Sequence, residues 1–303
     1  MKPFYLILLL AMNFFWAGVY SAYKVLVQHG LSPGGIVTLR FGLAGLCLAL
    51  IWPWLPGPAP RGKHLLVTGL MGLMLYVAGQ RLQVLGNHLG TAGNSSVLMA
   101  VEPLLTSVAA AIFLREPIGP RRLGGFALGL LGVALLNGVW RPDFHWTGLT
   151  ASLIFISSFI CEAGYSVLGK PIVQRASVMK MLAISLWTGT LANLLLDGRH
   201  TLAGAAALSP GAWGLLVLLA VLCTVVGYSV WFIVIRQCPV NLAALTVFSQ
   251  AVFGVPIAAF WLGEQVHWGH LFGSLTIVLG LALGFSRQLK PNPPAPGPAP
   301  AVD

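Results

Sequence analysis

Charged side chains are scarce in this chain of 303 residues: only 8% are Asp, Glu, Lys or Arg, against ~25% in ordinary soluble domains. Acidic residues are scarcest, with seven in all. The four cysteines stand at no spacing typical of a metal site, and the chain lacks His-Glu-x-x-His and Gly-x-Ser-x-Gly motifs. The composition excludes a soluble globule, and the missing motifs argue against an intramembrane enzyme. We expect neither metal nor cofactor.

Long apolar runs take the place of charge, since 57% of the residues are hydrophobic. A helix needs about 20 such residues to cross a hydrocarbon core of ~30 Å. The first run shows no cleavage site of small residues, so we expect it to be retained. The sequence predicts an all-α membrane protein with ten transmembrane helices, at Phe4–Tyr23, Gly34–Leu55, Leu65–Leu82, Ala92–Leu114, Leu123–Trp140, Gly148–Gly169, Met179–Leu196, Trp213–Ile235, Leu242–Leu262 and His270–Phe285.

The chain repeats itself. At an offset of 148, Glu116 falls on Glu264 and Gly132 on Gly280, and near the start an offset of 146 places Lys24 on Lys170. Each copy holds an odd number of predicted spans, which inverts the second copy in the bilayer, as in many secondary transporters. We expect five-helix repeats at residues 1–140 and 146–286, followed by a disordered proline-rich tail at 287–303.

The net charge of +10 does not indicate a nucleic-acid partner, because the basic residues are spread singly over loops. With a cytoplasmic N-terminus, twelve Lys and Arg residues fall on the inner side of the ten spans and four on the outer side. Positive charge is enriched in cytoplasmic loops. This bias predicts a multi-pass protein with both termini in the cytoplasm, with the lipid bilayer as its surroundings.

Several short runs resemble EamA-type members of the drug/metabolite transporter superfamily. They are Asn13-Phe14-Phe15-Trp16-Ala17-Gly18 with Lys24, Leu31-Ser32-Pro33, Leu39-Arg40-Phe41, Glu102-Pro103, Leu114-Arg115-Glu116 and Leu262-Gly263-Glu264. The resemblance covers residues 5 to 286 and implies ten helices in two inverted five-helix repeats. It also implies efflux or exchange of amino acids, other small metabolites or drugs by alternating access, in a bacterial plasma (inner) membrane. It names no particular substrate.

One departure from repeat symmetry concerns proline. Pro103 of the first copy corresponds to Ala251, whereas the second copy carries Pro256. Because proline disturbs the helix in which it lies, we expect the two halves to be distorted at different depths.

Two carboxyl groups are predicted deep in the bilayer. Glu102 lies about twelve residues into its predicted span, roughly 18 Å deep at ~1.5 Å per residue, and Glu162 is similarly deep. An ionised carboxylate there costs at least about 2.5 kcal/mol. Glu102 and Glu162 are candidate sites for a substrate ammonium group or for a proton. For Glu102 the alternative is a hydrogen-bonded carboxyl that braces the backbone beside Pro103.

Polar and aromatic side chains form stripes on several predicted helices and should face protein or water. Each can line a substrate cavity or pack between helices. Arg40 can pair with a carboxylate or snorkel to the interface. Together with the two carboxyls, the candidate substrate-binding residues are Asn13, Trp16, Tyr20, Arg40, Tyr76, Gln80, Tyr165, Tyr228, Trp231 and Gln250.

Residues that are identical at equivalent positions of the two copies are expected to have structural roles. Glu116 and Glu264 are expected to cap the helix that follows each of them, and Lys24 and Lys170 to anchor helix ends. Glycines on the fifth span of each copy allow close helix packing, within the chain or in a homodimer. A passive channel is the remaining alternative, but it would favour a ring of like polar groups. The repeats and deep carboxyls favour a transporter of small organic solutes, with protons as a second candidate cargo.

Overall fold

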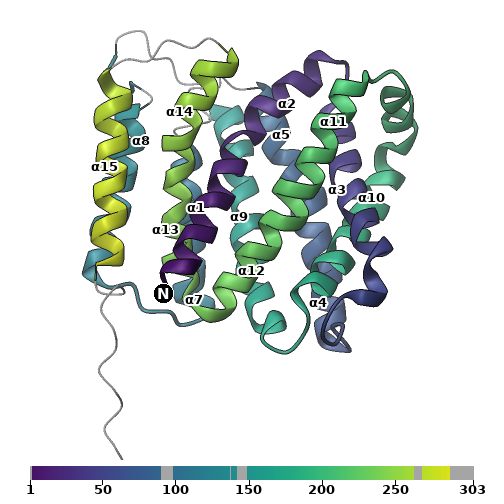
Figure 1. Cartoon of the computed structure of the whole chain (residues 1–303), viewed down its shortest axis with the longest axis horizontal. Coiled ribbons are helices and arrows are strands. Elements are labelled where there is room, and N and C mark those ends of the chain that lie inside the picture. Colours follow the sequence, from purple (N-terminus) through teal and green to yellow (C-terminus); the bar gives the residue numbers. More distant parts are fainter. Residues whose placement is uncertain (1, 90–97, 137, 142–148, 263–267, 287–303) are drawn as a thin grey trace, which may run out of the picture.

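The computed structural model describes residues 2–89, 98–136, 138–141, 149–262 and 268–286, and no strand occurs within these ranges (Figure 1). The first half contains α1 (Pro3–Ala17), α2 (Val19–Gln28), α3 (Pro33–Leu50), α4 (Lys63–Gly72), α5 (Gln80–Leu89), α7 (Glu102–Phe113) and α8 (Pro120–Leu136). The second half contains α9 (Leu149–Val173), α10 (Val178–Ala206), α11 (Pro210–Leu218), α12 (Gly227–Gln237), α13 (Val240–Leu245), α14 (Ser249–Leu262) and α15 (Trp268–Phe285).

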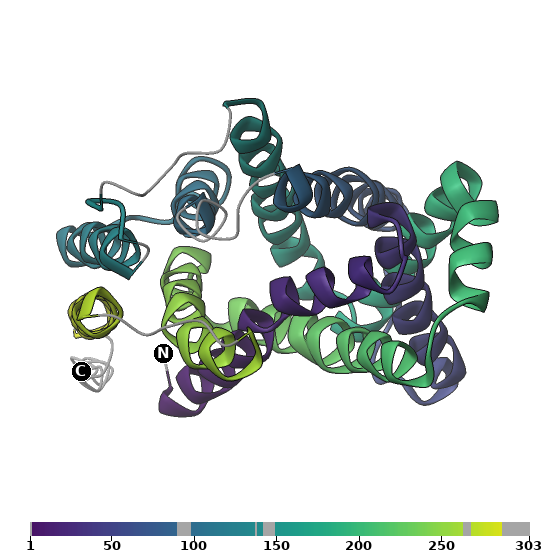
Figure 2. The same cartoon turned by 90° about the horizontal axis from the view of Figure 1, so that it is seen from above.

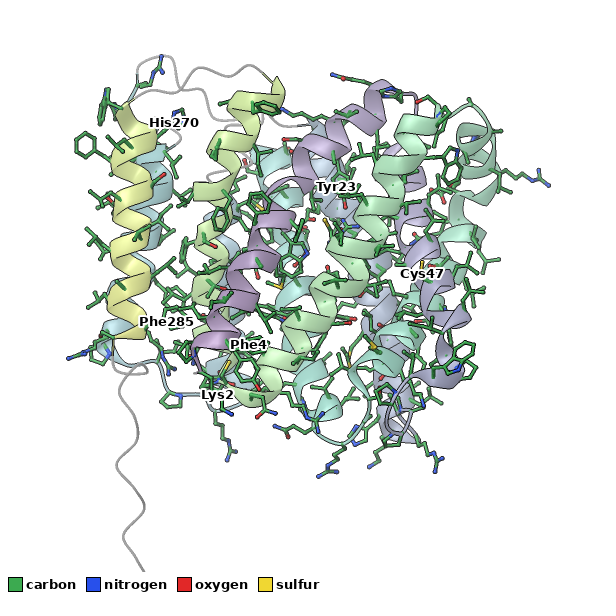
Figure 3. All side chains as sticks on the ribbon, viewed as in Figure 1. Lys2, Phe4, Tyr23, Cys47, His270 and Phe285 are labelled. Atoms are coloured by element: carbon green, nitrogen blue, oxygen red, sulfur yellow. The ribbon has the colours of Figure 1, made fainter. Side chains whose placement is uncertain are left out.

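Within the described ranges, seven helical stretches are long and apolar enough to cross a membrane. Two shorter apolar stretches, Glu102–Phe113 and Val240–Gly254, come from the predicted fourth and ninth spans. Nitrogen-tipped side chains gather at the edge of the molecule that carries Lys2 (Figure 3). An all-helical membrane architecture is therefore confirmed, while the number of ten spans and the orientation stay predictions.

Helices α8 and α15, which correspond to the predicted fifth spans of the two halves, pack side by side and run antiparallel. At one end Arg121 donates a hydrogen bond of 2.9 Å to the Ser286 hydroxyl. At the other end the rings of Trp140 and Trp268 lie 4.8 Å apart. Between these ends a Cβ on Gly132 would lie only 2.7 Å from a backbone oxygen of α15. Glycine is therefore required for the two backbones to approach this closely.

The second helices, α3 and α10, are also antiparallel neighbours. The Thr38 hydroxyl near the start of α3 donates to Asp197 late in α10, at 3.2 Å. The Trp187 indole, earlier in α10, donates to the carbonyl of Gly45 late in α3, at 2.8 Å. Equivalent helices of the two halves thus run in opposite directions, as an inverted repeat requires.

The first helix of each half packs against the other half. Helix α1 contacts α12 and α14, whereas α9 contacts α5 and α7. Seen from above, α1 runs from one edge of the molecule toward its middle, and the α8/α15 pair stands at one end (Figure 2). The two halves are therefore interlocked around their first helices, and neither forms a separate lobe.

Helical regularity breaks at equivalent positions in both halves. Two π-helical segments, η2 (Leu73–Gly79) and η4 (Leu219–Val226), interrupt the third helices. Two 3-10 turns, η3 (Met99–Val101) and η5 (Thr246–Phe248), precede the fourth helices α7 and α14. The prediction that the halves are distorted at different depths is wrong for these fourth helices.

Proline position explains the error. Pro103 lies in the first turn of α7, where its missing N–H has no helical partner to lose. Pro256 lies inside α14, beyond the 3-10 turn. The shared irregularity therefore precedes both prolines and does not depend on either.

Two acidic residues lie in local structures that differ from the prediction. Asp197 belongs to no loop: it stands inside α10 at a kink with φ −146° and ψ 19°. Its carboxylate forms an ion pair of 2.8 Å with Arg81 of α5. Glu102 is the first residue of α7, after a 3-10 turn, and not the middle of a continuous helix.

Candidate functional site

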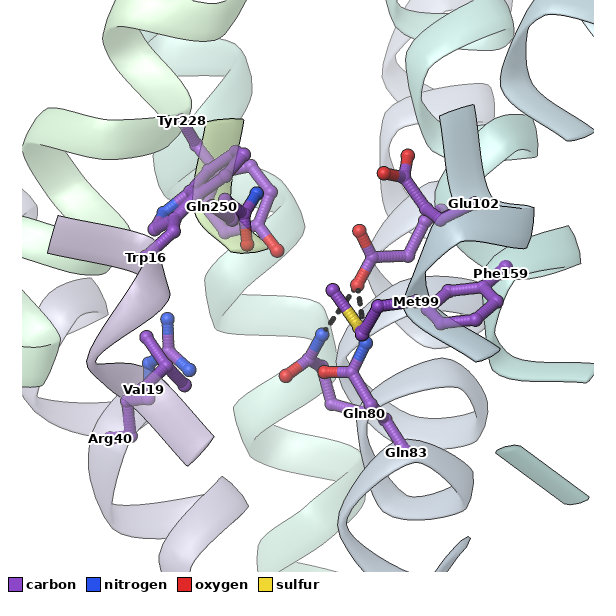
Figure 4. A pocket seen from close by; sticks show the side chains of 11 residues that line it. Trp16, Val19, Arg40, Gln80, Gln83, Met99, Glu102, Phe159, Tyr228 and Gln250 are labelled. Atoms are coloured by element: carbon purple, nitrogen blue, oxygen red, sulfur yellow. Dashed lines mark hydrogen bonds between the residues drawn. The ribbon is translucent and has the colours of Figure 1, made fainter. Parts of the chain in front are cut away.

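A cavity of about 50 Å³ lies among α1, α2, α3, α5, α7, α9, α12 and α14 (Figure 4). That volume has room for a few water molecules. Glutamate, glutamine and arginine side chains supply its polar surface, and aromatic and aliphatic groups the rest. The lining residues are Trp16, Val19, Arg40, Gln80, Gln83, Met99, Glu102, Phe159, Glu162, Tyr228 and Gln250.

Three pairs of repeat-related residues meet in this cavity. Trp16 and Glu162 are 146 apart, and the pairs Gln80 with Tyr228 and Glu102 with Gln250 are each 148 apart. Both members of each pair line the cavity. Repeat-related positions of the two halves therefore meet in the cavity, although the paired side chains differ in charge and chemistry.

Most of these side chains stand next to a break in helical regularity. Gln80 directly follows the end of η2, and Tyr228 is the second residue after the end of η4. Glu102 follows η3 directly, and Gln250 is the second residue after η5. Irregular backbone at membrane depth is tolerated where it lines a cavity, and π-helical segments are common at functional sites.

The two carboxyl groups belong to one wall. Glu162 accepts hydrogen bonds at the same oxygen, Oε1, from Gln80 at 2.9 Å and Gln83 at 3.2 Å. Glu102 is 8% exposed and accepts a bond of 3.0 Å from Thr106 through Oε1. Among the described residues, neither Oε2 atom accepts a hydrogen bond. Within the described chain each carboxyl is thus held through one oxygen only.

Arg40 stands on the opposite wall from Glu102, next to Val19 (Figure 4). It is 3% exposed, so it does not snorkel, and within the described chain no carboxylate lies within ion-pair distance of it. Its Nε donates to the Thr224 hydroxyl at 2.9 Å, and its Nη1 donates to the Tyr23 hydroxyl. Both expectations for Arg40 are replaced by a buried cation that neutral groups hold in place.

Backbone carbonyls freed by the irregular segments receive side-chain donors. The Trp16 indole donates to Cys223 O in η4 at 2.8 Å, and Asn193 donates to Tyr76 O in η2 at 2.9 Å. Asn13 donates to the carbonyl of Thr246 in η5 at 3.1 Å. Because unsatisfied backbone groups are costly in a dry interior, these donors stabilise the breaks beside the cavity.

The remaining candidate residues support the cavity from behind. Tyr76 and Tyr165 join hydroxyls at 2.9 Å, and Tyr165 reaches Ser185 at 3.0 Å. Their rings pack on Tyr228, with centroids within 6 Å. Trp231 donates to the Ser166 hydroxyl at 3.1 Å. Tyr76, Tyr165 and Trp231 are not among the residues that line the cavity.

Asn13 acts on the cavity indirectly, because its Oδ1 accepts a bond of 2.9 Å from Gln250. The side chain of Tyr20 lies outside the described residues. Gln83, which also lines the cavity, lies on the same helical stripe as Gln80, so the pattern that predicted Gln80 also indicated Gln83. Three apolar lining residues, Val19, Met99 and Phe159, carry no polar signal that sequence analysis could use.

A separate polar cluster joins the ends of α7, α9 and α12. Lys170 forms an ion pair of 2.6 Å with Glu116 and donates to Cys238 O at 2.8 Å. The second Glu116 oxygen accepts the Asn241 backbone N–H at the start of α13, at 3.2 Å. Glu116 therefore caps a helix of the other half and not the helix that follows it. Glu264 lies outside the described residues.

Comparison with known proteins bears on this arrangement. The model of the EamA-like transporter family matches twice, at residues 3–138 and 149–286. A "probable terminal-alkyne amino-acid exporter" of Streptantibioticus cattleyicolor is 25% identical over 90% of this chain and 91% of its own. A "probable amino-acid metabolite efflux pump" of Escherichia coli is 24% identical over 63% of this chain and 66% of its own.

A solved crystal structure superposes with a TM-score of 0.75 at 16% identity, covering 96% of this chain and all of the other. That likeness concerns the fold alone. The two family matches between them span nearly the whole chain and coincide with its internal repeat. The chain is a membrane transporter and not an enzyme: it belongs to the EamA-like transporter family.

Proposed function

We propose that this protein exports or exchanges small organic solutes that carry an ammonium group, such as amino acids and related metabolites. The observation that carries the proposal is the cavity wall on which Glu102 and Glu162 each present a carboxyl oxygen that accepts no hydrogen bond from the described residues. Carboxylates held in a water-poor cavity attract cations strongly. The names of the relatives, an amino-acid exporter and an amino-acid metabolite efflux pump, favour the same solute class.

Alternating access is the mechanism that the architecture favours. Ten spans in two inverted five-helix repeats, with both termini in the cytoplasm, would let the halves exchange conformations around the shared axis. The antiparallel pairs α3/α10 and α8/α15 support the inversion. A cavity of about 50 Å³ is smaller than ligand pockets, which hold on the order of 300 Å³ or more. Substrate binding therefore requires the halves to separate on one side.

Aromatic groups complete the proposed site. Trp16 and Tyr228 lie with ring centroids 5.5 Å apart, and both line the cavity. Their faces offer an apolar surface for the substrate side chain and a cation–π contact for its ammonium group. Protons remain a second candidate cargo of the same two carboxyls, because a protonated carboxyl avoids the cost of a buried charge.

Counterflow into liposomes tests the proposal. The purified protein is reconstituted, and a panel of amino acids and cationic drugs is measured with and without a pH gradient. Glu102→Gln and Glu162→Gln keep the shape of each side chain and remove its charge. Each is expected to raise the KM of a transported ammonium solute about tenfold or more, since hydrogen bonds to charged groups are the strong ones.

Glu116→Gln is the matched control, because it removes a carboxylate outside the cavity. It is expected to reduce the yield of folded protein and to leave KM unchanged. Wild-type flux that is the same with and without the pH gradient favours substrate binding by the two carboxyls over proton coupling. Normal transport by both cavity variants at every pH would refute the site, and absence of any counterflow would refute the function.

A further inference from the structure

Arg40 is an ionic group whose role the proposed ammonium site does not explain. It is the eighth residue of α3, and its side chain reaches the cavity wall opposite Glu102 (Figure 4). A buried cation is costly unless an anion compensates it. The two ion pairs recorded for the described residues, Arg81 with Asp197 and Lys170 with Glu116, do not include Arg40.

The guanidinium is held rigidly by groups that do not neutralise it. Thr224 of η4 accepts from Nε, and Tyr23 of α2 accepts from Nη1. The Phe41 ring centroid lies 5.0 Å from the guanidinium carbon and the Tyr23 centroid 5.7 Å from it. Three elements thus fix the plane of the side chain, which reduces the entropy that a ligand would otherwise lose in ordering it.

One edge of the guanidinium remains unused. Among the described residues Nη2 makes no hydrogen bond, although the residue is almost fully buried and lines the cavity. Arginine presents its N–H groups as a planar fork that matches a carboxylate. A purely structural brace would need only the bonds to Thr224 and Tyr23, and neither of these partners is an anion.

We propose that Arg40 binds the carboxylate of the transported solute, so that the cavity selects dipolar molecules with a carboxylate at Arg40 and an ammonium group at Glu102 and Glu162. This inference rests on the proposed function, because it assigns the second charged end of the same substrate. The two ends are recognised on opposite walls, one from each side of the cavity. A solute with only one of the two charges leaves the other wall uncompensated.

Competition in the counterflow assay tests the selection without any variant. The probes are the best-transported of the twenty proteinogenic L-amino acids, its carboxamide and its decarboxylated amine. The wild type is expected to bind the amino acid about tenfold or more tightly than either derivative, because both lack the carboxylate. Equal inhibition by all three would overturn the inference.

Variants then locate the selection at Arg40. Arg40→Gln should bring the inhibition constants of the amino acid and its carboxamide to within about twofold, while Arg40→Lys should retain part of the difference because it keeps the charge. Thr224→Val removes a brace and keeps the guanidinium. It is expected to weaken the amino acid more than the carboxamide, but by a smaller factor than Arg40→Gln does. Thermal melting of each variant reports whether it folds.

The possible failures are distinguishable. Transport confined to solutes without a carboxylate, or an unchanged preference for the amino acid in folded Arg40→Gln, overturns the role of Arg40 and leaves the transport function standing. Absence of counterflow for every solute in wild-type liposomes overturns the proposed function itself, and the inference falls with it.

Discussion

At the scale of single residues, burial separates two kinds of charged group in this protein. Lys170 and Glu116 are nearly buried and satisfy one another, with further bonds to Cys238 O and the Asn241 N–H. Glu102 and Glu162 are bonded through one oxygen each, and neither takes part in the ion pairs of the described structure. Fully paired charges suit a scaffold, whereas incompletely paired charges suit a site that takes a ligand.

The scaffold assignment predicts a particular pattern of stability. Glu116→Ala should lower the free energy of unfolding by on the order of 3 kcal/mol, because it leaves the Lys170 ammonium buried and unpaired. The double variant Glu116→Leu with Lys170→Met should recover most of that loss, since it removes both charges and fills the space. Thermal unfolding in detergent measures both. A double variant no more stable than the single one would contradict the assignment.

Sequence analysis identified charged cavity residues because a carboxyl in lipid demands an explanation, as at Glu102 and Glu162. It did not predict which residues of a helical stripe line the cavity, because that depends on their depth along the helix. Tyr76 and Gln80 share one stripe, yet only Gln80 lines the cavity, because a stripe reveals which face is turned inward and not how far along it the cavity lies. The partners of Arg40 could not be found, since Thr224 is neutral and 184 residues away.

At the scale of elements, paired irregularities surround the cavity. Two glycines that are 148 residues apart stand at the ends of the π-helical segments: Gly79 is the last residue of η2, and Gly227 directly follows η4. A Cβ on Gly79 would lie 2.8 Å from the Cβ of Cys161 in α9, and one on Gly227 would lie 2.7 Å from the Trp16 indole nitrogen in α1. Each glycine therefore lets a third helix touch the first helix of the other half.

This contact makes both glycines sensitive to a single added methyl group. Gly79→Ala and Gly227→Ala should each cost about 1–3 kcal/mol by overpacking, and should reduce counterflow by displacing Glu162 or Trp16 from the cavity. Gly214→Ala in α11 is the control, because a Cβ there meets no atom within 4 Å. Melting temperature and flux are measured for all three. Equal behaviour of the three variants would mean that the close contacts are unimportant.

The sequence predicted the repeat and the close-packing glycines of the fifth spans, but neither Gly79 and Gly227 nor the π-helical segments. A π-helical turn holds more residues than an α-helical turn. This difference leaves no trace in the hydrophobic pattern here, because nearly every residue of η2 and η4 is apolar. The stabilising donors are distant in sequence: Asn193 serves η2, and Trp16 serves η4. Proline, the one local signal, pointed instead to Pro103 and Pro256, neither of which lies in a π-helical segment.

At the scale of the whole molecule, interlocking of the halves gives the cavity its mixed character. Because α1 packs on α12 and α14 while α9 packs on α5 and α7, every wall contains side chains from both halves. The repeat-related pairs Trp16 with Glu162 and Glu102 with Gln250 then place unlike groups in equivalent environments. Symmetry of the backbone thus accompanies an asymmetric distribution of charge, as the proposed binding of a substrate with two unlike ends requires.

The central claim is that the transported solute occupies this cavity. Its most direct test is substrate protection of Val19→Cys, which adds a thiol to the cavity lining in a chain whose four native cysteines are replaced by alanine. A variant that retains only Cys47, which is half-buried in α3 and does not line the cavity, is the control. We predict that a transported amino acid slows maleimide labelling of Val19→Cys with a half-effect near its KM and leaves labelling of Cys47 unchanged. Labelling of Val19→Cys that is unaffected at saturating substrate would contradict the account.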